Sequence, residues 1–211
     1  MQEQAEELRP KGGRDEKRDA IVRIALEVFL SEGYAGTSMS NVAAKVGGSK
    51  ATLYNYFKSK EELFAAVVER KCTQIQNLLS QAEIESGGDL KATLTNFGEH
   101  FVELILSDQS IATFRLTTAE AARFPEIGQT LYNSGVRQNQ NRMAEFMQHA
   151  KEAGQLRRDA DVAVAAEQFL DLCVSGIHRR RLWNVTPAPT AADVRTNVAN
   201  AVDTFMRAFA A

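Results

Sequence analysis

Apolar side chains recur every three or four residues along most of this sequence, as they do on one face of an α-helix. Ile21, Ile24 and Val28 follow this spacing and predict a first helix over about 15–32. No segment alternates apolar and polar residues as a half-buried strand does, and no internal repeat is visible. The pattern predicts an all-α chain of about nine helices.

Glycine, proline and short polar residues mark where these helices begin and end. Gly33 is placed to end the first helix, and Gly47-Gly48 separates two short helices. Ser59 and Glu62 have the spacing of a capping box and open a long fourth helix. The later helices are predicted to begin at Asp89, near Ser110, at Pro125, at Asp159 or Asp161, and at Thr190.

The charges are unevenly distributed along the chain. The 211 residues carry a formal net charge of -2, yet the segment from Arg9 to Lys60 holds ten Lys or Arg residues and five Asp or Glu residues. This segment is net positive, and the rest of the chain is net negative. A basic N-terminal part on an acidic body predicts a polyanionic partner for that part. The 44% of hydrophobic residues suffices for a sizeable core.

Cysteine usage and apolar runs indicate a protein of the cytoplasm. Cys72 and Cys173 lie far apart and form neither a metal-type pair nor a disulfide framework. The N-terminus lacks the apolar core of a signal peptide, and the early apolar run over 20–30 is too short to span a bilayer. We expect a soluble, cytoplasmic protein with no cofactor, no metal and no membrane partner.

Groups suited to catalysis are sparse. His100 and Glu103 share one predicted helix face, but His149 lies elsewhere, and one such pair does not define a metal site. The sequence contains no Gly-rich phosphate loop. Neither cysteine has an evident activating neighbour, although a redox-sensing role for one of them stays open. We therefore expect a binding protein rather than an enzyme.

The two short helices, at about 38–46 and 50–56, lie on either side of a glycine-containing turn and predict a helix-turn-helix. Such a motif places its second helix in the major groove of DNA. Leu53 and Phe57 are spaced to face the core. The side chains left to point outward are those of Lys50, Thr52, Tyr54 and Asn55.

The stretch TSMSNVAAKVGGSKATLYNYFKSKEEL, residues 37–63, closely resembles the DNA-binding region of TetR-type transcriptional regulators. The resemblance runs from the first predicted helix into the fourth and includes the motif Thr52-Leu53-Tyr54, followed by Tyr56-Phe57. Two positions depart from the family pattern. Gly48 stands where an apolar residue is usual, and Ala51 where glycine is common, so both are expected to shift base preference.

The resemblance implies a set of DNA contacts on and around the second helix of the motif. Those implied to lie nearest the base edges are Lys50, Ala51, Thr52 and Tyr54. Those implied to bind phosphates are Thr37, Ser38, Tyr56 and Lys60, while Asn55 could do either. Ser49, which can also cap the helix, is counted among the DNA-binding residues. Half-buried packing is the alternative for Tyr54 and Tyr56, and we favour DNA contact because several residue types agree at once. Lys58 is expected to be solvated.

The resemblance also implies that the rest of the chain senses a ligand and forms a dimer. Residues 115–135 and 154–172 look like the C-terminal domain of AcrR-like members, which often repress efflux or stress-response genes and respond to small amphipathic compounds. An apolar cavity with a few polar anchors suits such a ligand. Its candidate lining residues are Phe97, Phe101, Phe114, Thr118, Phe146, Met147 and Phe169. For any single one of them, ordinary core packing is the more frequent role.

A homodimer is expected to bury the apolar stripes of the last two helices in a four-helix face. The candidate interface residues are Leu172, Val194, Val198, Val202, Phe205 and Phe209. The alternative is that one stripe packs against its own chain. The basic run HRRRLW at 178–183 is expected to be a solvated helix end rather than a second anion site.

These features predict a flexible polar tail at 1–14, a helix-turn-helix DNA-binding domain at 15–60 and a helical ligand-sensing and dimerisation domain at 61–211. The predicted function is a sequence-specific repressor that binds a palindromic double-stranded DNA operator as a homodimer. An unidentified small amphipathic ligand would release it. The alternative is a DNA-binding protein of the same fold that responds to a protein partner or to no ligand.

Overall fold

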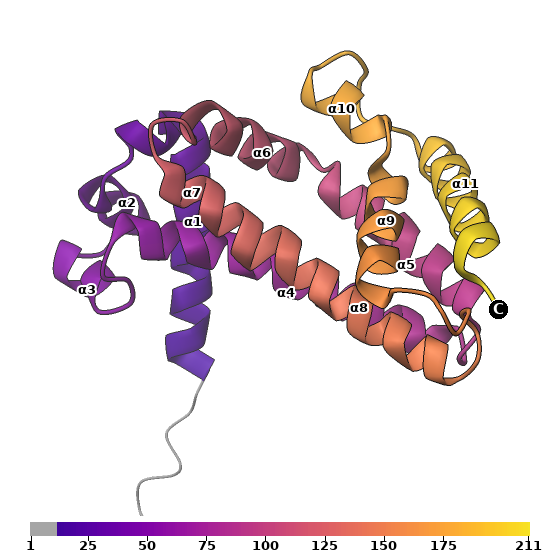
Figure 1. Cartoon of the computed structure of the whole chain (residues 1–211). Helices are drawn as coiled ribbons and strands as arrows, with labels where there is room; N and C mark the ends of the chain where they lie inside the picture. The colour runs from indigo at the N-terminus through magenta and orange to yellow at the C-terminus, as the bar shows by residue number, and fades with distance from the viewer. Residues whose placement is uncertain (1–11) are drawn as a thin grey trace, which may run out of the picture. The chain divides into compact units, whose positions relative to one another are not determined.

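A computed structural model describes residues 12–211 of the chain. Within that range the backbone forms the α-helical segments α1 to α11 and one π-helical segment, and the β pairing is limited to an isolated antiparallel bridge between Leu156 and Ala210. The all-α prediction is confirmed (Figure 1). No helix in the described range is long and apolar enough to cross a membrane. The chain divides into two compact units after Val67.

The first unit has an aromatic core. Its helices are α1 (Gly12–Gly36), α2 (Met39–Val46), α3 (Lys50–Tyr54) and the start of α4 (Lys60–Glu85). The rings of Phe29, Tyr34 and Phe64 lie 5.7, 5.4 and 5.6 Å apart between centroids, which joins α1 to α4. Gly33, with a φ of 73°, interrupts the helical backbone of α1 where the sequence predicts its end.

The boundaries of the first unit differ from those predicted. α1 begins at Gly12, so residues 12–14 are helical rather than part of a tail, and residues 1–11 lie outside the described range. The unit continues to Val67 instead of ending at Lys60. The reason is that Leu63 and Phe64 are 0% and 1% exposed and belong to the core of this unit.

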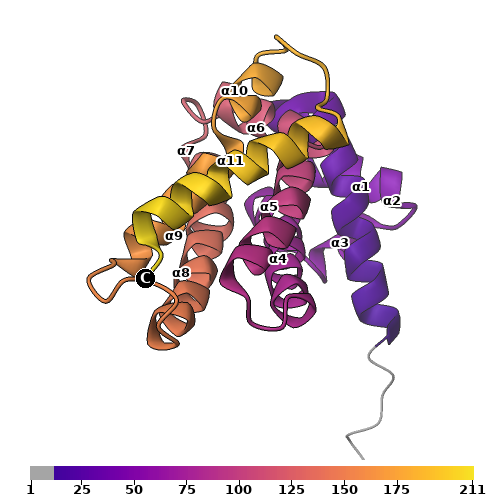
Figure 2. The same cartoon turned by 90° about the vertical axis from the view of Figure 1, so that its right-hand side faces the viewer.

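The second unit begins within α4 and continues to the C-terminus (Figure 2). Its further α-helices are α5 Leu90–Ile105, α6 Asp108–Glu120, α7 Pro125–Thr130, α8 Arg137–Glu152, α9 Val162–Val174, α10 Ile177–Leu182 and α11 Ala191–Phe209. Asp89, Asp161 and Thr190 each accept a hydrogen bond from a backbone N–H at the start of α5, α9 and α11. These three predicted helix starts are confirmed.

Two long predicted helices are interrupted. The helix that begins at Pro125 passes from α7 into a π-helical segment, Leu131–Val136, before it continues as α8. The helix predicted to run to Trp183 is divided into α9 and α10 at Gly176, whose φ of 71° is left-handed. The apolar periodicity continues across both breaks, so it could not reveal them.

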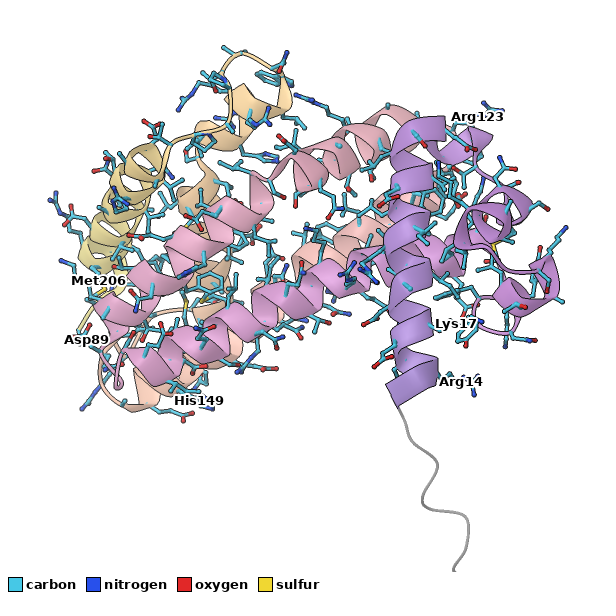
Figure 3. The ribbon with its side chains drawn as sticks, turned by 180° about the vertical axis from the view of Figure 1, so that it is seen from behind. Arg14, Lys17, Asp89, Arg123, His149 and Met206 are labelled. Carbon is cyan, nitrogen blue, oxygen red and sulfur yellow. The ribbon has the colours of Figure 1, made fainter. Side chains whose placement is uncertain are left out.

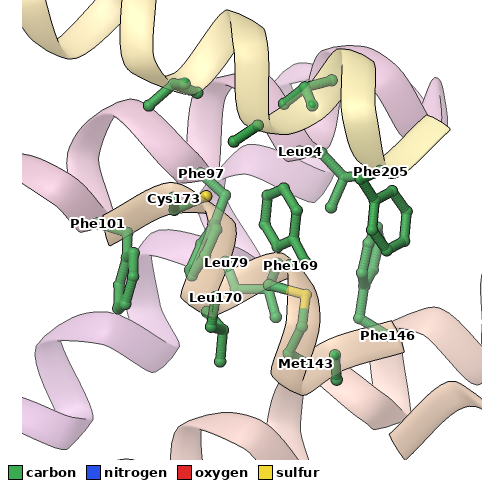
Figure 4. Packing of buried hydrophobic residues seen from close by; sticks show 14 of the residues in the cluster. Leu79, Leu94, Phe97, Phe101, Met143, Phe146, Phe169, Leu170, Cys173 and Phe205 are labelled. Atoms are coloured by element: carbon green, nitrogen blue, oxygen red, sulfur yellow. The ribbon is translucent and has the colours of Figure 1, made fainter. Parts of the chain in front are cut away.

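The second unit is organised around one apolar core to which α5, α8, α9 and α11 contribute. Phe97, Phe169 and Phe205, on α5, α9 and α11, form a chain of ring contacts with centroid separations of 6.3 and 5.3 Å (Figure 4). Gly98 allows α5 and α11 to approach closely, because a Cβ at this position would lie 2.8 Å from Val198 Cγ1.

Candidate DNA-binding site

The second helix of the motif, α3, is held by a cap at its start and by apolar contacts on its inner side. Ser49 Oγ accepts a hydrogen bond from the backbone N–H of Thr52 at 3.0 Å, which satisfies a donor that a helix start leaves free. Leu53 is 2% exposed, and Phe57, just beyond the helix, is 1% exposed. A helix of five residues is too short to be stable alone, so these two side chains hold it in place.

The first helix of the motif, α2, begins and ends at residues that the sequence predicts. The exposed Ser38 accepts a hydrogen bond at Oγ from the backbone N–H of Asn41 at 3.1 Å. Asn41 Nδ2 donates to Glu32 Oε2 at 2.8 Å, which links the start of α2 to α1. Gly47 ends the helix with a φ of 75°, a backbone conformation that other residues adopt only under strain.

The outer side of α3 presents side chains suited to DNA. The exposed residues there are Lys50, Ala51, Tyr54 and Asn55. Lys50 Nζ lies 5.8 Å from the centre of the Tyr54 ring, one helical turn away. An ammonium beside a phenol offers donors to phosphate oxygens or base edges. Thr52 is half-buried, and its Oγ1 lies 2.9 Å from Ser49 Oγ, so part of its hydrogen-bonding capacity is used in the helix cap.

Two arginines of α1 lie beside the aromatic residues that follow α3. Arg14 Cζ is 5.9 Å from the ring centre of the half-buried Tyr56, and Arg18 Cζ is 5.1 Å from that of Phe57. Arg14 and Lys17 stand on the first turns of α1 (Figure 3). The sequence analysis placed Arg14 in a tail and gave Arg18 no role. Arg14 and Arg18 are one helical turn apart, and this spacing indicates that they lie on the same face of a helix.

Two of the predicted phosphate-binding side chains are engaged within the protein. Thr37 is 3% exposed, and its Oγ1 donates to the Gly33 carbonyl oxygen at 2.7 Å. Lys60 Nζ donates to the Tyr34 carbonyl oxygen at 2.7 Å and lies 4.3 Å from the centre of that ring. Next to Lys60, the backbone N–H of Glu61 donates a hydrogen bond to the Glu61 carboxylate and lowers its pKa. Thr37 and Lys60 therefore hold the end of α1, which sequence spacing did not reveal.

The residues predicted to line a ligand cavity separate into two groups. Five of them are buried in the core of the second unit, each 8% exposed or less, namely Phe97, Phe101, Phe146, Met147 and Phe169. Phe114 is half-buried on α6, where its ring meets the His178 ring edge-on with centroids 5.0 Å apart. Thr118, on the same helix, is exposed. The structure thus brings five of the seven together.

The residues predicted at a dimer interface are largely internal. Those on α11 are 9% exposed or less and pack in the core of their own chain, namely Val194, Val198, Val202, Phe205 and Phe209. This burial agrees with the alternative in which the stripe packs against its own chain, and an interface role for these residues stays a prediction. Leu172 of α9 is half-buried at the edge of the core. The exposed face of α11 includes Ala199, Asn200 and Asp203.

The two cysteines are free, buried thiols. Burial raises the pKa of Cys173 to about 12. Burial and the negative charge of Glu69 raise the pKa of Cys72, whose Sγ lies 3.3 Å from Gln138 Oε1. The thiolate is the reactive form, so both thiols are poorly suited to redox chemistry. Among residues 12–211, no three His, Cys, Asp or Glu side chains gather in a way that could hold a metal ion.

Two family descriptions match separate parts of the chain. "Bacterial regulatory proteins, tetR family" matches residues 21–67, which contain α2 and α3. "AefR-like transcriptional repressor, C-terminal domain" matches residues 92–211, which is more than half of the chain.

The chain is 34% identical over 110 residues to the HTH-type transcriptional activator FasR of Mycolicibacterium smegmatis. The matched region covers 48% of this chain and 50% of FasR. The chain spans about half the length of the curated relatives that it matches. Its fold is similar to that of a TetR-family transcriptional regulator from Mesorhizobium loti, with a TM-score of 0.80 and 22% identity over 93% of this chain and 98% of that one. The flavonoid-responsive regulator FrrA is similar with a TM-score of 0.73 and 29% identity, over 93% of this chain and 98% of that one.

These matches extend over both compact units. The first contains the capped helices α2 and α3 with their exposed outer side, and the second contains most of the apolar helical body. The chain belongs to the TetR family of bacterial regulatory proteins.

Proposed function

We propose that this regulator is a repressor that binds a palindromic operator as a homodimer and leaves it when a small amphipathic ligand binds the second unit. The observation that carries the DNA-binding part is the outer side of α3. There Lys50, Tyr54 and Asn55 are exposed on a helix whose inner side is anchored by buried Leu53.

The chemistry of α3 suits base reading in the major groove, into which a second helix of this kind fits with its N-terminal residues toward the base edges. Lys50 can donate to the acceptors of guanine, and Asn55 can pair with adenine. Ser38, at the start of α2, would contact a phosphate. In a two-fold dimer, the two copies of α3 would read half-sites about 34–36 Å apart or somewhat further, which makes the operator palindromic.

Repression and ligand release are supported by the similar proteins. The family description that matches residues 92–211 names a repressor, and FrrA is described as flavonoid-responsive. A ligand releases DNA only if it binds more tightly to the conformation that cannot reach both half-sites. The difference between its two affinities therefore sets the extent of release.

Activation is the second candidate, because FasR is named an activator. The same α3 contacts would serve either outcome, and the position of the operator relative to the promoter would decide between them. Transcription in vitro from a promoter that carries the operator, with and without the protein, distinguishes the two. A fall in transcript supports repression, and a rise supports activation.

The first test is selection of bound sequences from a randomised double-stranded DNA library at two salt concentrations. We expect a palindromic motif and an affinity that falls steeply with salt, because Lys and Arg contacts to phosphates release counterions. Recovery of no motif, with only weak salt-sensitive binding, would contradict sequence-specific recognition.

Variants on the recovered operator separate DNA contact from folding. Tyr54→Phe and Lys50→Ala should each weaken binding, with a lost base contact costing about 1–3 kcal/mol. The melting temperature should stay unchanged, because both side chains are exposed. Lys58→Ala is the control, since Lys58 is exposed beyond the end of α3. Unfolding of Tyr54→Phe would show that the tyrosine packs instead of binding DNA.

A further inference from the structure

The first turns of α1 carry a basic face that their net charge conceals. Residues 14–19 contain three cations and three anions, so their formal net charge is zero. An α-helix turns by about 100° per residue, which places the cations on one side of α1 and the anions on the opposite side. The cations are Arg14, Lys17 and Arg18.

This segregation does not serve the stability of the helix itself. The charged residues of 14–19 that stand four positions apart are Arg14 with Arg18 and Asp15 with Asp19, and both pairs join like charges. Like charges at this spacing weaken a helix, whereas opposite charges support it. The arrangement therefore indicates a partner outside α1 for the basic side.

The basic face continues the buried stripe of α1. Ile21, Ala25 and Val28 are buried in the first unit, and Arg14, Lys17 and Arg18 stand seven, four and three positions before Ile21. These spacings place the cations on the same side of the helix as the stripe. Residues 13–19 are nevertheless exposed. The side of α1 that packs on the core further along is thus free and basic before Ile21.

Two ring contacts place this face beside the end of α3. Arg14 Cζ is 5.9 Å from the ring centre of Tyr56, and Arg18 Cζ is 5.1 Å from that of Phe57. Figure 3 shows Arg14 and Lys17 on these first turns. Tyr56 follows two positions after Tyr54, whose side chain is exposed on the outer side of α3. The basic face of α1 is therefore continuous with the surface that we expect to meet DNA.

The cations of this face are available to an external anion. The ion pairs found among residues 12–211 do not include Arg14, Lys17 or Arg18. A guanidinium that lies against a ring still presents its N–H edge, which can donate two parallel hydrogen bonds to one phosphate. The ammonium of Lys17 binds a phosphate as a point charge.

We propose that the basic face of α1, defined by Arg14, Lys17 and Arg18, binds phosphates of the operator beside the groove that α3 enters. Phosphates are the same in every sequence, so this face adds affinity and fixes orientation while α3 reads the bases. Its continuity with α3 favours DNA over an acidic protein as the partner. The inference rests on the proposed function, because α3 must first place the unit on an operator.

The first experiment titrates the full chain onto its selected operator over a series of salt concentrations. The double variant Arg14→Gln with Lys17→Gln should bind about tenfold or more weakly at physiological salt, and its salt slope should fall by about two. The control is Arg23→Gln, which removes an exposed arginine on the opposite side of α1 and should bind as the unmodified chain does. An unchanged slope in the double variant would overturn the proposal.

The single variants Arg14→Gln and Arg14→Lys separate charge from packing, because Arg14 also lies against Tyr56. Arg14→Lys keeps the positive charge but not the planar guanidinium, so it should keep the salt slope of the unmodified chain. A slope as low in Arg14→Lys as in Arg14→Gln would show that packing on Tyr56 carries the effect, and the phosphate role of Arg14 would be wrong.

The second experiment replaces single operator phosphates by neutral methylphosphonates. At the phosphates that α1 contacts, the replacement should weaken binding of the unmodified chain but cause a smaller further loss in the double variant, because the contact is already missing there. Losses that add independently at every phosphate tested would show that α1 touches none of them and would overturn the proposal.

The proposed function and this inference fail in different ways. If no operator is recovered from the DNA library with the unmodified chain, sequence-specific recognition fails. If an operator is recovered and the double variant binds it as the unmodified chain does, the basic face is not a DNA contact and the function of α3 stands. A different motif selected by the double variant would show that α1 reads bases and would contradict the phosphate assignment.

Discussion

Lys60 shows how a single residue holds parts of the first unit together. Its Nζ donates to the Tyr34 carbonyl oxygen at 2.7 Å and lies 4.3 Å from the centre of the Tyr34 ring. Lys60→Ala should lower the free energy of unfolding by about 1–3 kcal/mol, because a charge-assisted hydrogen bond and a cation–π contact are lost. Urea unfolding measures this change. The exposed Lys58→Ala should stay within about 0.5 kcal/mol of the unmodified chain, and an equal loss in both variants would contradict the role of Lys60.

The thiols of Cys72 and Cys173 should react slowly with thiol reagents in the folded protein. Burial raises the pKa of both thiols, so at about pH 8 less of each is in the reactive thiolate form than in the unfolded chain. A thiol-reactive dye should label the native protein far more slowly than the urea-unfolded protein. Ser80→Cys, at an exposed position of α4, should add one thiol that reacts at an ordinary rate. Rapid labelling of the native chain without that change would contradict the burial of these thiols.

The two adjacent glycines between α2 and α3 differ in backbone conformation. Gly47 has a φ of 75°, whereas Gly48 is not left-handed and a Cβ there would lie 3.9 Å from Thr52 Cβ. Gly47→Ala should therefore destabilise the protein by about 1–2 kcal/mol. Gly48→Ala should stabilise it by about 0.4–1 kcal/mol, by restricting the unfolded chain. Thermal unfolding of both variants is the measurement, and shifts in the same direction would disagree with this turn.

The packing of α5 on α11 depends on the absence of a side chain at position 98. Gly98→Ala should destabilise by about 1–3 kcal/mol, because its Cβ would lie 2.8 Å from Cγ1 of the buried Val198. The double variant with Val198→Ala should lose less than the sum of the two single losses. Gly13→Ala is the control, since nothing lies within 4 Å of a Cβ there. Strict additivity would show that the close approach is not the cause.

At the scale of the whole molecule, we expect the two faces of α11 to have different roles, one in folding and the other in association. The apolar stripe between Val194 and Phe209 is buried in its own chain, so we propose that the opposite face of α11, with the exposed side of α9, meets a second copy. Ala199→Arg should then shift the protein toward monomer in sedimentation while its helical circular dichroism is kept. Ser80→Arg, at an exposed position of α4, is the matched control. A dimer that tolerates Ala199→Arg as well as Ser80→Arg would place the interface elsewhere.

What the sequence by itself determined is local. Ser38, Asp89 and Thr190 cap helices where the sequence predicts, because a cap depends on a side chain and an N–H only two or three positions away. Gly33 and Gly47 end helices for a similarly local reason, the backbone conformation that they adopt without strain. The helix-turn-helix could therefore be predicted from a short stretch of chain.

Only the tertiary structure decided how distant residues pair. An apolar stripe shows that one side of a helix is buried but not against what, so the stripe of α11 could have served a dimer or its own core. Lys60 reaches the Tyr34 carbonyl oxygen across 26 positions, and Arg115 of α6 reaches the Leu182 carbonyl oxygen of α10 across 67. Such contacts follow from the arrangement of whole helices in space, which the spacing of residues along one helix does not contain.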